Sequence, residues 1–299
     1  MRWDAPGAGL RPHIPLTRRP PAPSAAREVP PLPYTAEISR TQPACVLLLV
    51  DRSGSMADPW QPGAASKAAQ VAETLNDLLR NIVLKCSKDD GVRGYFDVAA
   101  LGYGERIAPL LGERAMCSVQ DLAEAPLRLE QRLRRAGGDE RTVQFPVWVE
   151  PHARGGTPMR AAFQAARRAL EPWVVSHPLS HPPIVFHVTD GESTDGDPTP
   201  DAARLRELQT RDGELLLFNV HISGASSREV LFPTAVPDLP DPFAQMLFAI
   251  SSALTEDQRA LLHLEGYEAP EGARGFIFNG DPVALVDFLD VGTRPANLR

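Results

Sequence analysis

Short apolar runs alternate with helical patterns of hydrophobic residues along the chain from Cys45 onward. The first run, CVLLLV at residues 45–50, is apolar throughout. Residues 66–85 instead carry apolar side chains three and four positions apart, which places them on one face of a helix. Continuous apolar strands separated by amphipathic helices are typical of a mostly parallel sheet covered on both faces. We therefore expect an α/β fold.

The same patterns place the other elements. Residues 96–104 (FDVAALGYG) and 105–112 (ERIAPLLG) predict a hairpin, so one edge strand of the sheet should be antiparallel. Further strands are expected at 182–190, 215–222 and 275–278, a brief extended segment at 147–149, and helices at 119–123, 159–170, 201–210, 241–254, 255–264 and 282–289. Residues 113–145 are weakly patterned and predict an irregular connection around the short helix. The whole is one domain with a sheet of about six strands and helices on both faces.

The N-terminal 40 residues differ from the rest of the chain. They contain nine prolines and few large apolar side chains, so they cannot bury enough surface to offset the entropy of ordering. We predict a flexible tail over residues 1–40 and a folded domain over residues 41–295. A solvated leader is favoured over a PxxP-like docking segment.

Composition narrows the classes of partner and compartment. The net charge of -7 gives no general attraction to nucleic acid or anionic lipid. No apolar run is long enough to span a membrane, and the start lacks the apolar core of a secretory signal. Cys45, Cys86 and Cys117 fit neither a disulfide framework nor paired metal ligands, which favours buried free thiols in a reducing compartment. We expect a cytoplasmic protein, and the Ala, Arg and Pro bias is common in bacteria with GC-rich genomes.

Two aspartates stand where buried strands end. Asp51 and Asp190 each close an apolar run, and ligands of parallel sheets bind at the carboxyl ends of the strands. Neighbouring carboxylates repel each other unless a cation lies between them. Ser53 and Ser55 can point the same way from an extended turn, with Gly54 permitting a tight backbone. Hydroxyl and carboxylate oxygens suit Mg²⁺ or Mn²⁺ and suit Zn²⁺ poorly.

Three motifs carry a family resemblance. DRSGS at 51–55 resembles the DxSxS element of von Willebrand factor A (vWA) domains, GGT at 155–157 resembles their threonine loop, and TDGE at 189–192 resembles their second aspartate element. They occur in the family's order and each follows a predicted strand. The resemblance implies a Rossmann-like vWA fold over roughly residues 43–292.

The resemblance also implies a metal-ion-dependent adhesion site (MIDAS). In such a site Ser53, Ser55 and Thr157 bind Mg²⁺ or Mn²⁺ through hydroxyl oxygens, while Asp51 and Asp190 hold it directly or through water. One coordination position stays open for a Glu or Asp of a protein partner, so the implied function is recognition.

Residues near the motifs are candidates for the rim of a partner site. They are Trp60, His152, Arg154 and Glu192. Each has a plainer alternative: Trp60 can pack on the first helix, His152 and Arg154 can be solvated loop residues, and Glu192 can keep an acidic loop soluble.

An enzyme is the main alternative class. A haloacid-dehalogenase-like phosphatase would need a second carboxylate two residues after Asp51, and Ser53 occupies that position. No GxSxG, HExxH or GxxxxGK[ST] motif occurs, and prolines next to His177 and His181 oppose a helical zinc pair. We predict a protein that is not an enzyme, with a metal-dependent hydrolase as the alternative.

The loops around GGT and TDGE resemble bacterial cytosolic vWA proteins more than matrix proteins. These occur in tellurium-resistance-like gene clusters and beside MoxR-type AAA ATPases, kinases or phosphatases. The resemblance implies an adaptor or scaffold in stress response or defence. A partner subunit for a separate AAA ATPase, as in magnesium chelatase, is the related alternative.

Overall fold

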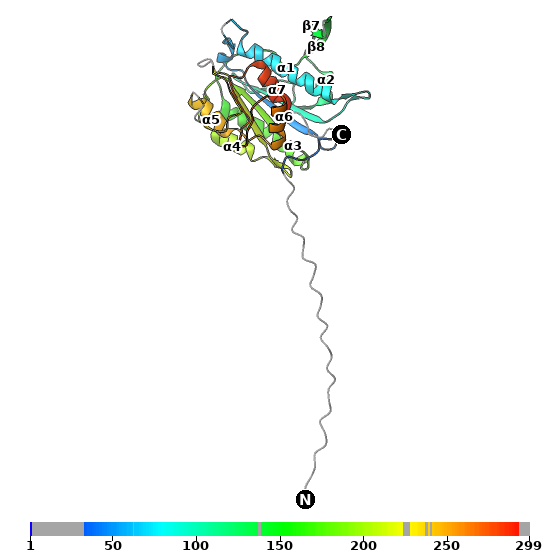
Figure 1. The fold of residues 1–299 in the computed structure, drawn as a ribbon, viewed down its shortest axis with the longest axis vertical. Helices are drawn as coiled ribbons and strands as arrows, with labels where there is room; N and C mark the ends of the chain where they lie inside the picture. Colours follow the sequence, from blue (N-terminus) through cyan, green and yellow to red (C-terminus); the bar gives the residue numbers. More distant parts are fainter. Residues whose placement is uncertain are drawn as a thin grey trace. The chain divides into compact units, whose positions relative to one another are not determined.

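The computed structural model describes residue 1 and residues 33–61, 63–136, 139–223, 228–236, 239 and 241–292 (Figure 1). By its internal contacts the chain divides into Met1–Pro31 and Leu32–Arg299, and the second unit holds every element described below. Most of the predicted tail lies outside the described residues. Within the second unit Ile38 is buried in the core, and Tyr34 N donates a hydrogen bond to Asp212 O at 2.7 Å. The domain therefore includes residues 34–38, which the sequence pattern assigned to the tail.

A central sheet of eight strands organises the domain, in the order β13-β14-β12-β9-β1-β4-β5, with β6 also paired to β4. Five strands are parallel: β1 (Ala44–Asp51), β4 (Phe96–Tyr103), β9 (Ile184–Thr189), β12 (Leu216–His221) and β14 (Phe276–Phe278). Three short strands are antiparallel: β5 (Ala108–Pro109), β6 (Met116–Ser118) and β13 (Val230–Leu231). The mostly parallel sheet is confirmed. Antiparallel strands lie on both of its edges, whereas the sequence pattern indicated one.

The strand order contains a switch point. From β1 the chain moves outward to β4 and β5, then returns to β9 on the other side of β1 and continues to β12 and β14. The order of the main strands is that of a doubly wound sheet, in which ligands bind at the carboxyl ends where the order reverses. Here that place lies between the ends of β1 and β9.

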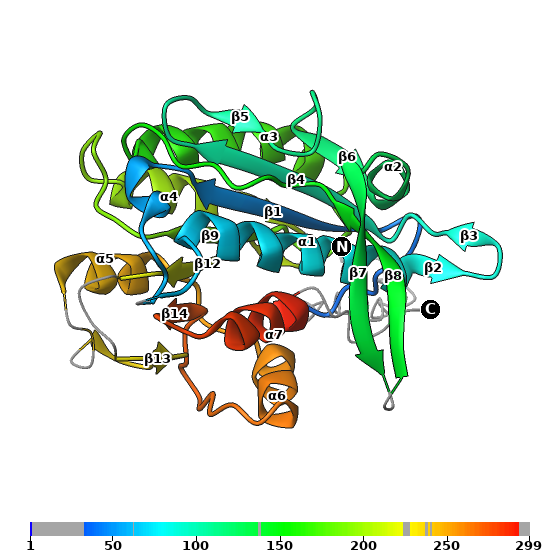
Figure 2. The same cartoon turned by 90° about the horizontal axis from the view of Figure 1, so that it is seen from above.

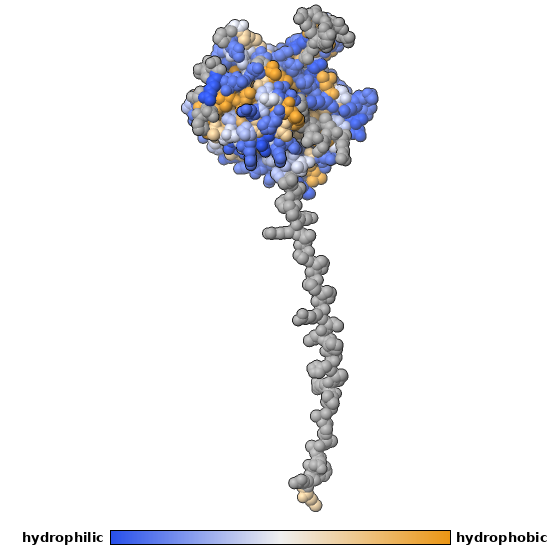
Figure 3. All heavy atoms as spheres, viewed as in Figure 1, coloured by the Kyte–Doolittle hydropathy of each residue, from blue (hydrophilic) through white to orange (hydrophobic). Residues whose placement is uncertain are grey.

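Helices cover both faces of the sheet, as predicted. Helices α1 (Lys67–Cys86) and α3 (Met159–Ser176) lie on opposite faces of the sheet (Figure 2). Alternate residues of β1 pack toward them: Leu47 and Leu49 lie in the cluster with α3, and Val46 and Leu48 lie in the cluster with α1. The α3 side also includes α4 (Thr199–Arg206) and α5 (Pro242–Ile250), and the α1 side includes α2 (Val119–Glu124), α6 (Glu256–Leu264) and α7 (Pro282–Gly292). Hydrophobic side chains reach the surface around α7 (Figure 3).

A separate hairpin contradicts the expected irregular connection at 113–145. It consists of β7 (Arg128–Ala136) and β8 (Asp139–Val147). Its inner face is charged: the Arg132 guanidinium lies 3.6 Å from the ring centre of buried Phe145 and pairs with Glu73 of α1. Leu129 and Leu133 are instead more than half exposed. Because leucines face solvent and an arginine faces the domain, the pattern of apolar residues gave no strand signal.

Smaller differences occur at element ends. The helix expected at 201–210 stops at Arg206, and β10 (Gln209–Thr210) pairs with β11 (Gly213–Glu214) directly after it. The helix expected at 241–254 ends at Ile250. A short hairpin of β2 (Ser87–Lys88) and β3 (Gly91–Val92) follows α1. No helix among the described residues is long and apolar enough to cross a membrane.

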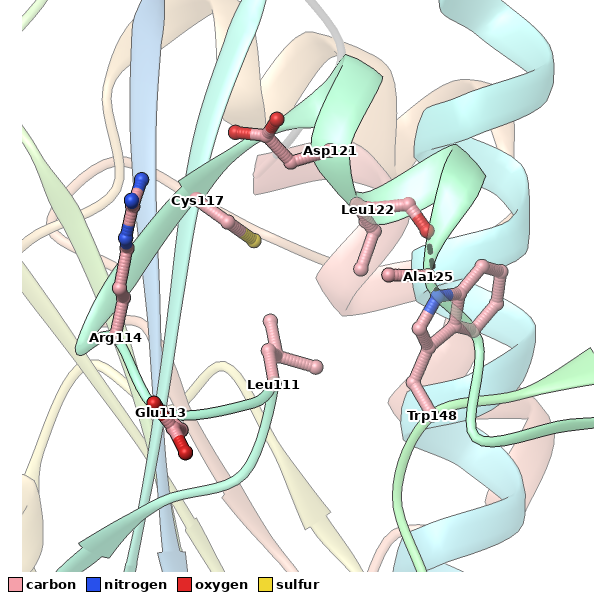
Figure 4. Close-up of a pocket in the computed structure, with 8 residues that line it drawn as sticks. All are labelled: Leu111, Glu113, Arg114, Cys117, Asp121, Leu122, Ala125 and Trp148. Atoms are coloured by element: carbon pink, nitrogen blue, oxygen red, sulfur yellow. Dashed lines mark hydrogen bonds between the residues drawn. The ribbon is translucent and has the colours of Figure 1, made fainter.

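Residues 148 and 149 lead from the hairpin into the GGT loop and are tightly held. Asn76 of α1 accepts hydrogen bonds from Trp148 N at 2.8 Å and Val149 N at 3.0 Å, and donates to Val149 O at 2.9 Å. The Trp148 indole donates to Leu122 O at 2.7 Å (Figure 4). A buried amide with three satisfied bonds thus fixes where this segment enters the site.

The three cysteines are free thiols, as predicted, although Cys117 is only half-buried. Cys45 and Cys86 are buried, and Cys117 lines a pocket of ≈ 350 Å³ beside Trp148 (Figure 4). Burial raises the pKa of Cys117 to about 11. Since the thiolate is the reactive form, this raised pKa lowers the reactivity of the thiol at neutral pH.

Candidate metal centre

Asp51 is the last residue of β1 and is almost fully buried. Its Oδ1 accepts a hydrogen bond from Ser53 N at 2.8 Å, and its Oδ2 accepts one from Thr189 Oγ1 at 2.7 Å. Burial raises the pKa of Asp51 to about 6, although these hydrogen bonds oppose the rise. A carboxylate that is costly to ionise here gains from a cation placed against it.

The two serines of DRSGS point to the same place. A single 3-10 turn, η1 (Gly54–Ala57), follows Ser53 and brings Ser53 Oγ to 3.2 Å from Ser55 Oγ. Ser55 Oγ also donates to Asp190 Oδ1 at 2.8 Å. Adjacent oxygens of an octahedral Mg²⁺ site lie roughly 3.0 Å apart, because each is about 2.1 Å from the ion. The two observed spacings are close to that value.

Thr157 belongs to a different loop, which packs against the serine turn. The loop is tied to the serine turn by a hydrogen bond from Gly54 N to Gly155 O at 2.9 Å. A side-chain carbon built on Gly191 would lie 3.9 Å from Thr157 Oγ1 and 4.0 Å from Ser55 Oγ, so both hydroxyls lie beside the TDG loop. Thr157 itself is buried. All three motifs therefore meet at the ends of β1 and β9.

Main-chain hydrogen bonds join the loops around the site. Arg52 N donates to Tyr103 O at 2.7 Å, Arg154 N donates to Arg52 O at 2.7 Å, and Glu105 N donates to Arg154 O at 2.9 Å. Gly155 has a φ of 90°, and a side-chain carbon there would lie 2.3 Å from Glu105 N. Only glycine permits this close approach of the loops.

Lys67 is also part of the site, although no sequence motif indicated it. Its Nζ lies 2.7 Å from Asp190 Oδ2, and the two side chains are 5% and 0% exposed respectively. Lys67 is the first residue of α1, where the helix dipole disfavours a cation. Because a lysine is unfavourable in the first turn of a helix, its presence there could have indicated that Lys67 pairs with an anionic side chain.

A buried polar chain lies beneath the site. The Tyr103 hydroxyl and His187 Nε2 are 2.6 Å apart, and His187 Nδ1 lies 2.8 Å from Asn219 Oδ1. Asn219 Nδ2 donates to Leu247 O and to Ser251 Oγ. Since the Asn219 oxygen accepts, Nδ1 of His187 carries the proton and Nε2 accepts from tyrosine. Burial lowers the pKa of His187 to about 4, so the imidazole is neutral.

This histidine predicts a pH effect on folding. An unfolded histidine has a pKa near 6.5, so the unfolded chain binds the proton more tightly, and the free energy of unfolding falls as the pH drops from about 6.5 to 4. The loss attributable to His187 is roughly 3 kcal/mol. Urea unfolding of wild type, His187→Gln and the exposed control His263→Gln should show it, with ¹⁵N NMR reporting a neutral His187 at pH 5.5. A protonated His187 at that pH would contradict the assignment.

The expected rim residues lie near the site but do not converge on it. Trp60 is partly buried against the core on the α1 side, which is its plainer alternative. His152, Arg154 and Glu192 are exposed. The acidic loop has a structural role: Asp195 accepts hydrogen bonds from Arg160 N and Ala161 N at the start of α3, and Asp197 accepts one from Thr199 N at the start of α4.

The oxygen donors present fit a hard divalent cation. Within the described residues no group of three or more His, Cys, Asp or Glu side chains could hold a metal. The site instead combines hydroxyls with two carboxylates, a donor set that suits Mg²⁺ or Mn²⁺, and the Ser53–Ser55 and Ser55–Asp190 oxygen pairs lie at octahedral spacing. The residues that would hold the ion are Asp51, Ser53, Ser55, Thr157 and Asp190.

Comparisons with known proteins give distant structural matches. No family model and no curated protein matches the sequence. A von Willebrand factor type A structure from Catenulispora acidiphila is 15% identical, covering 83% of this chain and 42% of that chain at a TM-score of 0.42. The pilus adhesin SpaC from Lactobacillus rhamnosus GG is 12% identical, covering 85% of this chain and 30% of that one at a TM-score of 0.46. The ArnB paralog VWA2 from Sulfolobus acidocaldarius is 12% identical, covering 60% and 35% at 0.33.

The chain thus spans less than half the length of these three proteins. At such TM-scores the likeness is too partial to define the fold. The α/β, Rossmann-like class follows from the strand order and from the helices on both faces of the sheet.

Proposed function

We propose that this domain is a metal-dependent protein-interaction module of the vWA type, which binds a carboxylate of a protein partner through Mg²⁺ or Mn²⁺. The observation that carries the proposal is the meeting of three separate motifs at one switch point, where Ser55 Oγ lies 3.2 Å from Ser53 Oγ and 2.8 Å from Asp190 Oδ1. A bound divalent cation would supply a Lewis-acidic position for a Glu or Asp oxygen from outside.

The protein's own residues prepare this position. Asp51 supplies buried negative charge and orients Ser53 through the main chain. Ser55 and Asp190 are held together by a hydrogen bond, and Lys67 fixes the second oxygen of Asp190. Thr157 enters from a loop whose main chain is bonded to the serine turn. The hydroxyls are neutral, so the site keeps less negative charge than a carboxylate cage and remains attractive to an incoming anion.

Partner capture should depend on the cation and on Thr157. We expect a partner retained by the immobilised protein in Mg²⁺ to be released by EDTA and lost with Thr157→Ala, because that variant removes one hydroxyl ligand. Thr142→Ala, at an exposed threonine of β8 outside the three motifs, is the matched control and should retain capture. Capture that survives both EDTA and Thr157→Ala would contradict a metal-dependent interface.

The cellular setting we propose is that of a bacterial cytoplasmic adaptor. A partner of the AAA ATPase, kinase or phosphatase class is consistent with a module that recognises carboxylates. Turnover of a generic phosphoester in Mg²⁺, abolished by Asp51→Ala, would instead favour the hydrolase alternative.

A further inference from the structure

A groove of ≈ 610 Å³ beside the metal centre is lined mainly by positively charged side chains among its ionisable residues. Its lining includes Arg52, Arg106, Arg154 and His152, against a single acidic residue, Glu105. The chain as a whole carries a net charge of -7, so this concentration of positive charge is local. From it we propose that the groove is a second binding subsite, for consecutive oxyanion side chains of an acidic partner segment.

Arg52 connects the groove to the metal centre. It lies between Asp51 and Ser53 in the sequence, and its guanidinium donates to Glu150 O at 3.3 Å. Its stem crosses β4 at Gly102, where a side-chain carbon would lie 2.5 Å from Arg52 Cδ. A glycine at the end of β4 therefore leaves room for this arginine, which enters the groove instead of projecting freely into solvent.

The arginines have little internal compensation. Among the described ion pairs none involves Arg52 or Arg106, and Arg154 approaches Glu105 only to 3.9 Å with both side chains exposed. Exposed pairs of this kind contribute little energy, so they leave the guanidinium free to bind another anion.

Guanidinium groups define the chemical class of the ligand. Arginine presents a planar set of N–H donors that matches carboxylate or phosphate oxygens in pairs, and clusters of arginine recognise acidic or phosphorylated motifs. The groove volume lies within the usual range for specific sites. This inference rests on the proposed function, in which one carboxylate of the partner binds the cation. The acidic side chains that follow in the partner segment would then bind Arg52, Arg106 and Arg154.

Peptide binding by the full chain tests the groove. The probe is a fluorescent octapeptide of Glu and Gly, with a phosphoserine version and a Lys version for comparison, measured by anisotropy in Mg²⁺ and in EDTA. We expect the acidic peptides to bind with salt-sensitive affinity and the Lys peptide not to bind. Arg106→Glu and Arg154→Glu should each weaken binding at least tenfold, whereas Arg168→Glu, an exposed arginine on α3, should leave it unchanged.

The two proposals can fail separately. If the groove binds acidic residues, the acidic peptide still binds in EDTA, although more weakly. Thr157→Ala then removes only the Mg²⁺-dependent part of the affinity. Mn²⁺ binding by the arginine variants should equal that of wild type. Preference for the Glu or the phosphoserine peptide identifies the source of the oxyanion. Equal binding by Arg106→Glu, Arg154→Glu and Arg168→Glu, or no salt-sensitive binding by wild type, would overturn the groove while leaving the metal centre intact.

Discussion

Replacing Asp51 with asparagine is expected to abolish divalent-cation binding. The variant keeps the size of the side chain but removes the charge that the neutral hydroxyls of Ser53, Ser55 and Thr157 cannot replace. A ligand at a hundred times its Kd stabilises a folded protein by about 2.7 kcal/mol. We therefore expect Mg²⁺ to raise the midpoint of wild-type unfolding and to leave the midpoint of Asp51→Asn unchanged, with calorimetry showing no Mn²⁺ heat for the variant.

The control for this experiment is Asp58→Asn. Asp58 is exposed and ends the same 3-10 turn, so it tests for a general charge effect near the loop. It should behave as wild type. Equal stabilisation of Asp51→Asn and wild type by Mg²⁺ would contradict a divalent-cation site that includes Asp51.

Replacing Lys67 with methionine is expected to cause a large loss of stability in EDTA. The side chain of Asp190 is fully buried, and the variant would leave its charge without the ammonium partner at 2.7 Å. Removing one member of a buried ion pair costs about 3 to 5 kcal/mol. Because a divalent cation can supply the missing positive charge, Mg²⁺ should recover more stability in Lys67→Met than in wild type. Denaturant unfolding with EDTA and with Mg²⁺ measures both effects.

The chain offers a matched control in another lysine. Lys88 is exposed in the short hairpin after α1, and Lys88→Met should change the free energy of unfolding by less than about 0.5 kcal/mol. Should Lys67→Met lose no more stability than Lys88→Met, the Lys67–Asp190 pair would not be a structural part of the site. A variant too unstable to purify in EDTA but folded in Mg²⁺ would give the predicted result in a stronger form.

The parallel sheet and its carboxyl-end site could be predicted because their signals are local. CVLLLV is apolar throughout and IVFHVT is mostly apolar, and each is followed at once by polar residues that the fold brings together. Parallel strands end at the same edge, so the convergence of DRSGS and TDGE follows once both strands are recognised. The placement of GGT beside them required the family's motif order, since residues 150–158 have no regular structure of their own.

The features that the sequence pattern did not predict depend on tertiary contacts. The hairpin of β7 and β8 carries Arg132 inward over Phe145 and leucines outward, which reverses the usual pattern of buried and exposed residues. The adjacent glycines at 137 and 138 were a hairpin signal that this reversal concealed. Asp195 lies in a loop that is 34 residues from the start of α3 in the chain, yet its carboxylate accepts a hydrogen bond from Ala161 N there. No local sequence pattern indicates such a contact.

The hydrogen bonds among the loops after β1, after β4 and before α3 have a consequence for the thermodynamics of docking. Gly54, Arg154 and Glu105 have their main-chain donors satisfied by neighbouring loops before any partner arrives. The conformational entropy of these loops is therefore lost during folding and not during association. A partner should meet a rigid surface, so the heat-capacity change of binding should correspond to surface burial alone, without the larger change that accompanies coupled folding.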